Sequence, residues 1–305
     1  GVAGSIVSMA DYAATWQTYA VTVTPNGSEK LGGINTSAVL STEGQSITLV
    51  YVDSTQGWVN TMDSTSNVRG NPYMVASVSG ACNAITTCGN CSMAKFVGPG
   101  TFTVCSAAVC AADNLVSYVV VAGGGGGGDG GAGGGGAGGY REVISPISPY
   151  TGSPTQGYPT PGNRITVSGS PGAYAIAVGG GGAGGTTVGV SGSVSTFDSI
   201  TSAGGGGGGS RSGGAPPCEP SERAGLPGGS GGGGGGTCGP RPDPDGGSGD
   251  TPPTTPAQGT DGGYGKNSGN HQGGGGGGAI SAGSDGDCSP DTGGPGGGGA
   301  TTSIT

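Results

Sequence analysis

The stretch GGGGGGDGGAGGGGAGG spans residues 123–139 and consists almost entirely of glycine. Glycine has no Cβ, so such a run buries no side chains and cannot build an ordinary core. It either stays disordered, as flexible linkers do, or aligns as polyproline-II helices that pack backbone against backbone. Collagen chains pack in this way at their glycine positions. Five further runs follow at 179–185, 204–209, 228–236, 273–278 and 293–299.

The residues around these runs favour packing over disorder. Single Ala, Ser, Asp or Thr residues interrupt the runs, and these are not the charged residues that keep a linker solvated. Apolar, strand-like stretches at 116–122, 174–178 and 197–203 precede three of the runs and would anchor them. Six residues of polyproline II span about 19 Å, at ~3.1 Å per residue. We therefore predict a bundle of antiparallel polyglycine-II helices joined by loops.

Composition restricts the rest of the chain. The 305 residues include 79 Gly and 21 Pro, with 9% charged and 31% hydrophobic residues. Both fractions are low for a soluble domain, in which charged residues make up ~25%. A conventional core fits only in roughly the first 120 residues, which hold most of the Val, Ile, Trp and Phe. The net charge of −9 and the scattered Lys and Arg argue against nucleic acid as a partner.

The predicted fold is a set of all-β N-terminal domains followed by the polyglycine-II bundle, with almost no α-helix. Residues 10–17 alone could form a helical turn or two, and Trp16 and Trp58 are expected in the core or at a subunit contact. Gly98–Gly100 is expected to form a turn between two strands. The predicted domains are 1–62 (a shaft and trimerisation domain), 63–122 (a second β unit) and 123–305 (the bundle). The predicted strands are 5–9, 20–24, 46–52, 73–78, 94–97 and 101–104, and the predicted loops are 140–166, 210–227, 237–272 and 279–292.

Eight cysteines are candidates for disulfides, and their even number suits an extracellular particle. The spacing C-x2-C-x13-C-x4-C from Cys88 to Cys110 is also that of a tetrahedral zinc site, although a hairpin disulfide could join Cys105 and Cys110 instead. We favour disulfides or free thiols and expect neither a metal nor a cofactor. The disulfide candidates are Cys82, Cys88, Cys91, Cys105, Cys110, Cys218, Cys238 and Cys288.

Catalysis has little support in the sequence. His271 is the only histidine, so no redundant Ser–His or Cys–His site can be built, and we expect no enzyme activity. Acidic residues that gather in two loops could bind calcium, or could converge as carboxylates for glycan cleavage, but neither group follows the EF-hand pattern. A solvated acidic loop is the simpler interpretation. The two groups are Asp243, Asp245 and Asp250, and Asp285, Asp287 and Asp291.

Several motifs occur in an order that resembles one family. They include GPGTFTV at 98–104, YVVVAGGGGGG at 118–128, GGYRE at 138–142 and STFDSITSAGGGG at 195–207. The chain resembles the glycine-rich C-terminal region of tail fibres from marine phages and cyanophages, over nearly its whole length. It is more distantly similar to the polyglycine-II tail-fibre-tip adhesins of T-even phages. These are separate monomeric proteins, whereas here β domains precede the glycine part.

This resemblance implies a phage tail-fibre adhesin that attaches the virion to its host. Its expected partners are a bacterial surface receptor (a glycan or an outer-membrane protein), two further copies in a homotrimer, and other phage tail proteins. The expected location is the virion, outside the cell. A purely structural role, as a head fibre, decoration protein or filament subunit, is the alternative, and an antifreeze role or a polysaccharide depolymerase is more remote. The candidate receptor contacts are exposed loop residues, with tyrosines that could either stack on sugars or pad the scaffold. They are Tyr150, Tyr158, Arg211, Arg223, Arg241 and Tyr264.

Overall fold

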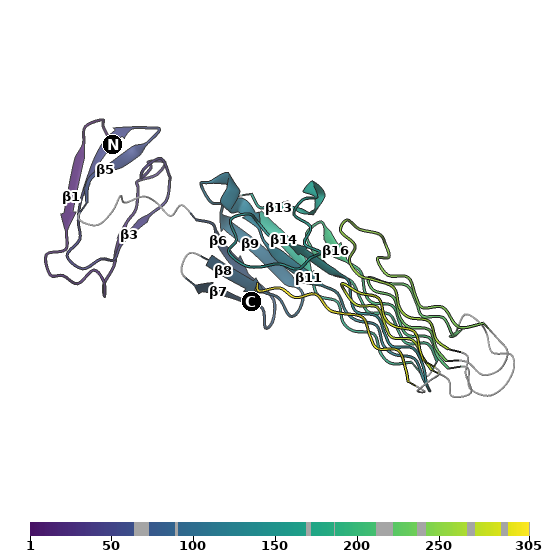
Figure 1. The fold of residues 1–305 in the computed structure, drawn as a ribbon. Coiled ribbons are helices and arrows are strands. Elements are labelled where there is room, and N and C mark those ends of the chain that lie inside the picture. The colour runs from purple at the N-terminus through teal and green to yellow at the C-terminus, as the bar shows by residue number, and fades with distance from the viewer. Residues whose placement is uncertain are drawn as a thin grey trace. The chain divides into compact units, whose positions relative to one another are not determined.

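The chain forms two compact units of β-structure, seen in a computed structural model (Figure 1). Unit 1 comprises Gly1–Val75 and Ala107–Asp113, and unit 2 comprises Ala76–Ser106 and Asn114–Thr305. The predicted all-β character is confirmed, because the helices of the described residues are two short 3-10 turns, Ala111–Asn114 and Pro161–Asn163. None of the described helices is long and apolar enough to cross a membrane. The structure describes residues 1–63, 73–88, 91–168, 172–185, 187–211, 222–236, 242–266, 272–287 and 292–304.

Unit 1 contains a three-stranded sheet in the order β1-β4-β5 and a separate antiparallel pair, β2-β3. Ile47 and Leu49 of β4 are both buried, because residues two apart in a strand lie on the same face. They join Leu31, Ala38 and Leu40 in a small core, against which Trp16 and Trp58 pack, as predicted for core residues. The strands are β1 (Ile6–Ala10), β2 (Val21–Val23), β3 (Ala38–Leu40), β4 (Ser46–Asp53) and β5 (Gly57–Asp63).

The segment after β1 folds as turns around a buried carboxylate, so the helical turns predicted at 10–17 are wrong. The Asp11 carboxylate accepts hydrogen bonds from the backbone N–H groups of Thr15, Trp16 and Gly44, each at 3.0 Å. An aspartate that bonds nearby backbone N–H groups offers the chain an alternative to the helix. Asp11 thereby also joins this segment to the turn before β4.

Replacing Asp11 with Asn should lower the stability of unit 1 at neutral pH and have much less effect in acid. Burial acts to raise the pKa of the Asp11 carboxyl, but the backbone N–H groups of Thr15, Trp16 and Gly44 outweigh it, so the pKa is lowered. A lowered folded-state pKa adds stability above the unfolded-state value of about 3.9, and that stability disappears as the pH falls through the folded pKa.

Tryptophan fluorescence in urea at pH 7 and pH 3 measures this effect, because both tryptophans of the chain, Trp16 and Trp58, lie in unit 1. A difference between wild type and Asp11→Asn that is the same at both pH values would contradict the assignment.

Unit 2 contains a five-stranded sheet in the order β16-β15-β14-β9-β6 and three two-stranded sheets, β7-β8, β10-β13 and β11-β12. The chain bends at residues 97–99, close to the predicted turn at 98–100, but β8 and β9 on either side enter different sheets. The strands are β6 (Val75–Val78), β7 (Ala84–Cys88), β8 (Cys91–Lys95), β9 (Gly100–Ser106), β10 (Leu115–Val116), β11 (Tyr118–Val121), β12 (Tyr140–Val143), β13 (Ile165–Thr166), β14 (Gly172–Ala177), β15 (Ser195–Phe197) and β16 (Ile200–Ser202).

Residues 76–106 and 114–122, expected in a separate second β unit, lie in the same unit as the glycine runs. Long-range strand pairing explains this, since β9 pairs with β14 and β11 pairs with β12, from beyond the first glycine run. The sheets share an aromatic core in which the Phe197 ring packs edge-on to those of Phe102 and Tyr118, with centroids 6.3 and 5.7 Å apart.

Strands lead directly into the glycine-rich part, as predicted: β11, β14 and β16 each continue into a glycine run (Figure 1). From there the chain passes back and forth in extended stretches that hydrogen-bond side by side, which we call the glycine segments. Several lie in regions predicted as loops. The glycine segments are 122–129, 132–139, 178–185, 187–194, 203–211, 222–227, 228–236, 242–250, 258–266, 272–279, 281–287 and 292–299.

Hydrogen bonds between glycine segments repeat every three residues. The N–H groups of Ala122, Gly125 and Gly128 donate to carbonyl oxygens of segment 132–139, at 2.9–3.2 Å. The N–H groups of Gly123 and Gly126 donate instead to segment 187–194. A three-residue repeat is that of polyproline II, whereas a β-strand alternates every two residues. This repeat supports the predicted polyglycine-II bundle.

Glycine is required in these segments because neighbouring backbones lie too close for a Cβ, and not because of the backbone dihedral angles. None of the described glycines within these segments has a positive φ. A Cβ on Gly232 would lie 2.1 Å from the carbonyl oxygen of Gly207, and one on Gly262 would lie 2.1 Å from that of Gly232. Real Cβ atoms essentially never approach so closely, so most positions that face another segment exclude alanine.

A glutamine holds several segment ends together near the sheets. Gln258 is 1% exposed, and its side-chain oxygen accepts a hydrogen bond from the Ala203 N–H at 2.8 Å. Its side-chain amide donates to the carbonyl oxygen of Pro252 at 2.7 Å, and its own N–H donates to the Asp250 carboxylate at 3.0 Å. Because the side-chain oxygen and amide of Gln258 both bond to backbone groups, Gln258 fixes the turn at 250–258 against the start of segment 203–211.

Candidate functional site

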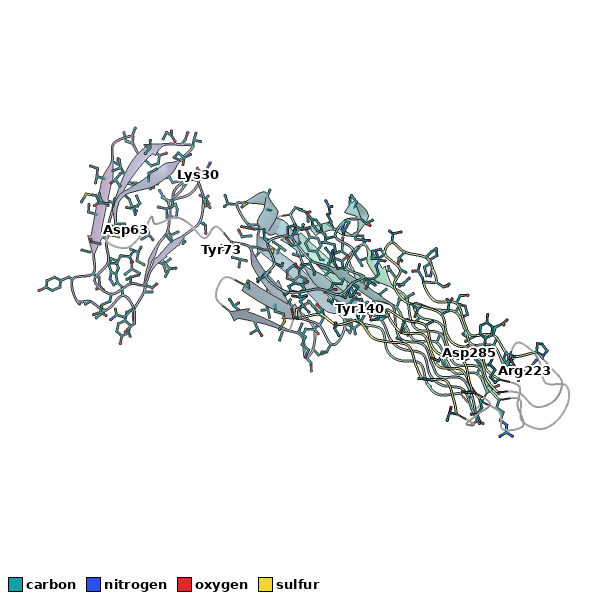
Figure 2. The ribbon with its side chains drawn as sticks, in the orientation of Figure 1. Lys30, Asp63, Tyr73, Tyr140, Arg223 and Asp285 are labelled. Carbon is teal, nitrogen blue, oxygen red and sulfur yellow. The ribbon has the colours of Figure 1, made fainter. Side chains whose placement is uncertain are left out.

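The predicted contact residues lie at opposite ends of unit 2. Tyr150 and Tyr158 lie between β12 and β13, at the sheet end. Arg223 lies toward the opposite end of the glycine segments (Figure 2). The backbone hydrogen bonds place Arg211 and Tyr264 at the same end. We call that end the distal end and define it as residues 128–133, 209–211, 222–223, 234–236, 242–244, 264–266, 272–273 and 285–287. Arg241 lies outside the described residues.

The two loop tyrosines are packed into unit 2, so the expectation that they are exposed is wrong. Burial raises the pKa of Tyr150 to about 12, and its hydroxyl donates to the carbonyl oxygen of Val143 at 3.4 Å. The Arg164 guanidinium lies 4.2 Å from the centre of the Tyr158 ring, and its Nε donates to the Tyr158 carbonyl oxygen at 2.8 Å. These contacts make both tyrosines part of the scaffold, which was the second of the two roles considered for them.

The distal end displays charged and aromatic side chains on a backbone scaffold. Arg211 is exposed and Tyr264 is 49% exposed, as predicted for both. The N–H of Arg211 donates to the carbonyl oxygen of Asp129 at 3.1 Å, which joins the ends of two segments that are far apart in sequence. Arg223, in contrast, is buried, and its prediction as an exposed residue is wrong.

A lysine at the distal end bridges two carboxylates. Lys266 Nζ lies 3.0 Å from Asp243 Oδ2 and 3.6 Å from Asp285 Oδ2. The hydrogen bond that Lys266 donates to Asp243 raises the pKa of Lys266. Asp285 also accepts a hydrogen bond from the Tyr264 N–H at 2.9 Å. All three charged groups are partly exposed, so the bridge orders this surface more than it stabilises the fold.

The structure does not support calcium binding by the first acidic group. Asp250 lies at the sheet end, where it accepts hydrogen bonds from Thr254 and Gln258, whereas Asp243 lies at the distal end. They are separated because residues 242–250 form one extended segment instead of a loop. Asp291 falls outside the described residues, and the residues that are described contain no cluster of His, Cys, Asp or Glu suited to a metal.

The cysteines that the structure describes are not arranged as a zinc site either. Cys82, Cys91 and Cys110 are exposed free thiols, so none of them forms a disulfide here. Cys105 lies with its sulfur 3.8 Å from the Ser77 hydroxyl. The Cys88 side chain, and the whole of Cys218, Cys238 and Cys288, lie outside what the structure describes, so their pairing stays a prediction.

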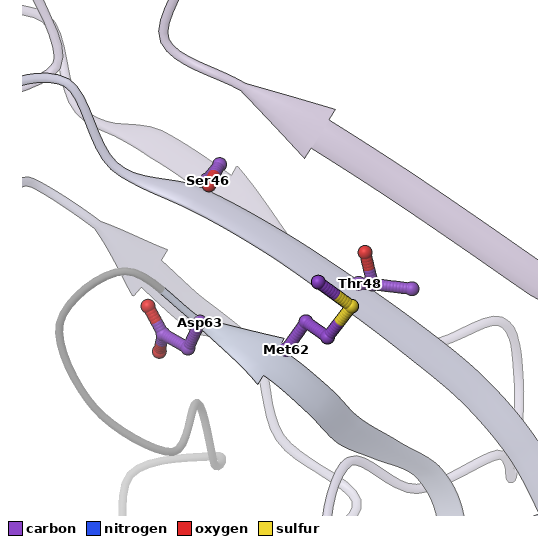
Figure 3. Close-up of a pocket in the computed structure, with 4 residues that line it drawn as sticks. All are labelled: Ser46, Thr48, Met62 and Asp63. Atoms are coloured by element: carbon purple, nitrogen blue, oxygen red, sulfur yellow. The ribbon is translucent and has the colours of Figure 1, made fainter.

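A shallow, open pocket of about 360 Å³ lies in unit 1, where β4 and β5 pair irregularly (Figure 3). It is lined by Ser46, Thr48, Met62 and Asp63. Met62 is 71% exposed, so the hollow gives little enclosure to a ligand. These residues include one carboxylate and no histidine, which gives no nucleophile–base pair.

The distal end is therefore the candidate site. The glycine segments position it, and its chemistry is that of a binding surface with cationic, acidic and aromatic groups. Sequence reasoning identified Arg211, Arg223 and Tyr264, and it placed Asp243 and Asp285 in two acidic groups, but it missed the bridge that Lys266 makes between these two aspartates. Searches of family models, of curated proteins and of solved structures found no match to this chain.

Proposed function

We propose that this chain is the receptor-binding part of a bacteriophage tail fibre, which attaches the virion to a molecule on the surface of a bacterial host. The observation that carries the proposal is the alternating direction of the glycine segments. Successive segments run away from the sheets and back, so the far ends of many segments lie side by side at the distal end. Binding residues are commonly carried on connections that a rigid scaffold positions.

The scaffold fits this role because it is held mainly by hydrogen bonds between backbone groups. Segment 228–236, for example, bonds to segments 203–211, 258–266 and 272–279. Side chains at the turns are then free to vary without disturbing a core. The cationic, acidic and aromatic groups at the distal end suit non-covalent adhesion. Repetition of the site over several fibres would strengthen weak binding.

Unit 1 suits the expected association with further copies and with other tail proteins. A small domain that exposes many large apolar residues often buries them against a partner. In unit 1 these include Val2 at 76%, Ile6 at 65%, Tyr12 at 101% and Met62 at 71% exposed. A homotrimer formed through unit 1 would carry three distal ends. With a net charge of −9, the chain is not expected to bind nucleic acid.

Charge reversal at the distal end should weaken attachment to host cells. The experiment adds fluorescently labelled chain to a panel of bacterial strains and scores both saturable binding and protection from phage adsorption. We expect Arg211→Glu to lower the apparent affinity at least about tenfold, as removal of an interface arginine commonly does. The matched control is Lys95→Glu, which makes the same charge change on an exposed residue of β8.

Equal, undiminished binding by both variants would exclude the distal end as the contact surface. If the wild-type chain binds no strain, including one that the parent phage infects, the alternative role as a structural fibre subunit replaces the adhesin proposal.

A further inference from the structure

Arg223 is a buried cation at the distal end (Figure 2). Its side chain is 5% exposed, and its Nε and Nη1 atoms are both closed off from solvent without a hydrogen-bond partner. The adjacent Glu222 is exposed, and among the described residues no carboxylate lies within ion-pair distance of Arg223. The guanidinium is thus held inside the protein, and none of the described residues supplies an opposite charge to it.

This arrangement is unusual on physical grounds. Arginine stays protonated under all ordinary conditions, and its nitrogens can only donate hydrogen bonds. A lysine or a carboxylate in such a place would become neutral, but arginine cannot. Buried charges in proteins are therefore almost always paired. The unmet need of Arg223 is an acceptor that carries negative charge.

Other cations of unit 2 show that the chain can supply acceptors, whether charged or neutral. Lys266, also at the distal end, is matched by Asp243 and Asp285. At the sheet end, Arg141 donates to Asn163 Oδ1 at 2.6 Å and Arg164 donates to the Tyr158 carbonyl oxygen. Arg223 therefore differs from Lys266, Arg141 and Arg164, whose charged groups each have an acceptor in this chain, because its Nε and Nη1 atoms have none.

The backbone around Arg223 is fixed on two sides. Its carbonyl oxygen accepts a hydrogen bond from the Gly235 N–H at 2.7 Å. The preceding carbonyl, of Glu222, accepts from both the N–H and the hydroxyl of Ser210, at 2.8 and 2.9 Å. A donor on a fixed backbone loses little freedom when a ligand binds, which favours affinity.

We propose that Arg223 binds an oxyanion group of the receptor, either a carboxylate or a phosphate, so that the receptor is an anionic surface glycan. This inference rests on the proposed function for the receptor, but the oxyanion site itself can be tested separately. An oxyanion supplies several acceptor oxygens together with the opposite charge, and its hydrogen bonds to arginine are among the strongest in proteins. The anion reaches the nitrogens when the side chain turns outward, which the rotatable stem of arginine allows.

The first test follows the side-chain Nε–H resonances of the ¹⁵N-labelled wild-type chain by NMR. The probes are glucuronate, which carries a carboxylate, and glucose 1-phosphate, with neutral glucose at the same concentration and ionic strength. The Arg223 signal is assigned by its loss in Arg223→Lys. We expect a saturable shift with one or both anions, half complete on the order of 1 mM, and no shift with glucose.

Arg164 provides the control within the same spectrum, because its Nε already donates to the Tyr158 carbonyl oxygen. Its resonance should stay in place throughout. Which anion shifts the Arg223 signal tells a carboxylated from a phosphorylated glycan. If neither anion moves it at tens of millimolar, or if glucose moves it equally, the site does not bind oxyanions and the inference is overturned. The wild-type titration decides this even where a variant fails to fold.

A second test separates this inference from the proposed function. Arg223→Lys keeps the charge but loses the planar donor array, and Arg223→Gln loses both. We expect at least about tenfold weaker binding of each folded variant to a strain that the wild type binds. Undiminished binding by both would overturn Arg223 as the receptor's anion site while the adhesin proposal stands. If the wild type binds no strain, the adhesin proposal fails and the NMR titration alone decides whether the site exists.

Discussion

Replacing Gly276 with alanine is expected to destabilise unit 2 by about 3 kcal/mol or more, at the upper end of what overpacking costs. The added Cβ would lie 2.0 Å from the carbonyl oxygen of Gly135, in a neighbouring segment. Segment 272–279 is buried along its whole length and bonded to several others, so it has no free direction in which to move. The thermal transition of unit 2 should fall by on the order of 10 °C.

Gly180→Ala is the matched control, since it makes the same substitution in another glycine segment. A Cβ there meets nothing within 4 Å, and Gly180 has no positive φ. Its effect should be neutral or slightly stabilising, by up to about 1 kcal/mol, because alanine restricts the unfolded chain. Scanning calorimetry measures both variants, and tryptophan fluorescence shows whether unit 1 is unaffected. Equal losses at both positions would mean that close backbone packing does not hold the segments together.

Gln258→Leu should cost unit 2 about 2–5 kcal/mol without leaving a cavity. Leucine fills a similar volume but accepts nothing from the Ala203 N–H and donates nothing to the Pro252 carbonyl oxygen. The N–H of Ala203, a residue that is 7% exposed, is left without a partner at a cost of about 1–3 kcal/mol, and the lost hydrogen bond to the exposed Pro252 adds about 1 kcal/mol. The turn at 250–258 should loosen as well, which hydrogen exchange of the Ala203 amide would report as faster exchange.

The comparison for this variant is Gln17→Leu, because Gln17 is exposed and makes a single hydrogen bond, to the Ala14 carbonyl oxygen at 2.9 Å. A surface change of this kind should stay within about 0.5 kcal/mol. If Gln258→Leu melts within a degree or two of wild type, water or a rearranged turn replaces the lost bonds and Gln258 does not hold the segment ends.

The strands that enter the glycine part were predictable because their signal is local. Val119 and its neighbours, Tyr174–Ala177 and Phe197 combine β-branched, aromatic and alternating residues directly before a glycine run. Strands β12 and β13 were missed, since each is short and forms only by pairing with a partner far away in the sequence. Pairing at a distance leaves no mark in a window of local sequence.

The segments inside the predicted loops did leave a mark. Gly259, Gly262 and Gly265 recur every third residue, and each faces a backbone oxygen of segment 228–236 at 2.0–2.2 Å from its ideal Cβ. Gly189 and Gly192 repeat the spacing in segment 187–194. A polyproline-II helix has three residues per turn, so one glycine per turn is enough to pack one side. An uninterrupted glycine run is needed only where other segments pack against a segment on all of its sides.

At the candidate site, residue type was informative and exposure was not. Arg211 and Tyr264 are exposed as predicted, and their role in binding stays a prediction, whereas Tyr150 and Tyr158 proved to be scaffold residues. The sequence of a loop does not show which of its side chains are buried, so a tyrosine that packs against the scaffold could not be distinguished from one that is free to bind a receptor. The bridge from Lys266 to Asp243 and Asp285 joins three different segments, and only the folded register brings these residues together.

The exclusion of Cβ atoms between segments has a genetic consequence. Any change in the first or second base of a glycine codon replaces glycine with a larger residue or a stop, and at a position such as Gly232 the larger residue has no space. Selection should therefore hold the scaffold codons constant, while codons for the turns drift or recombine freely. A gene of this kind can exchange one turn for another with related genes and still encode an intact scaffold.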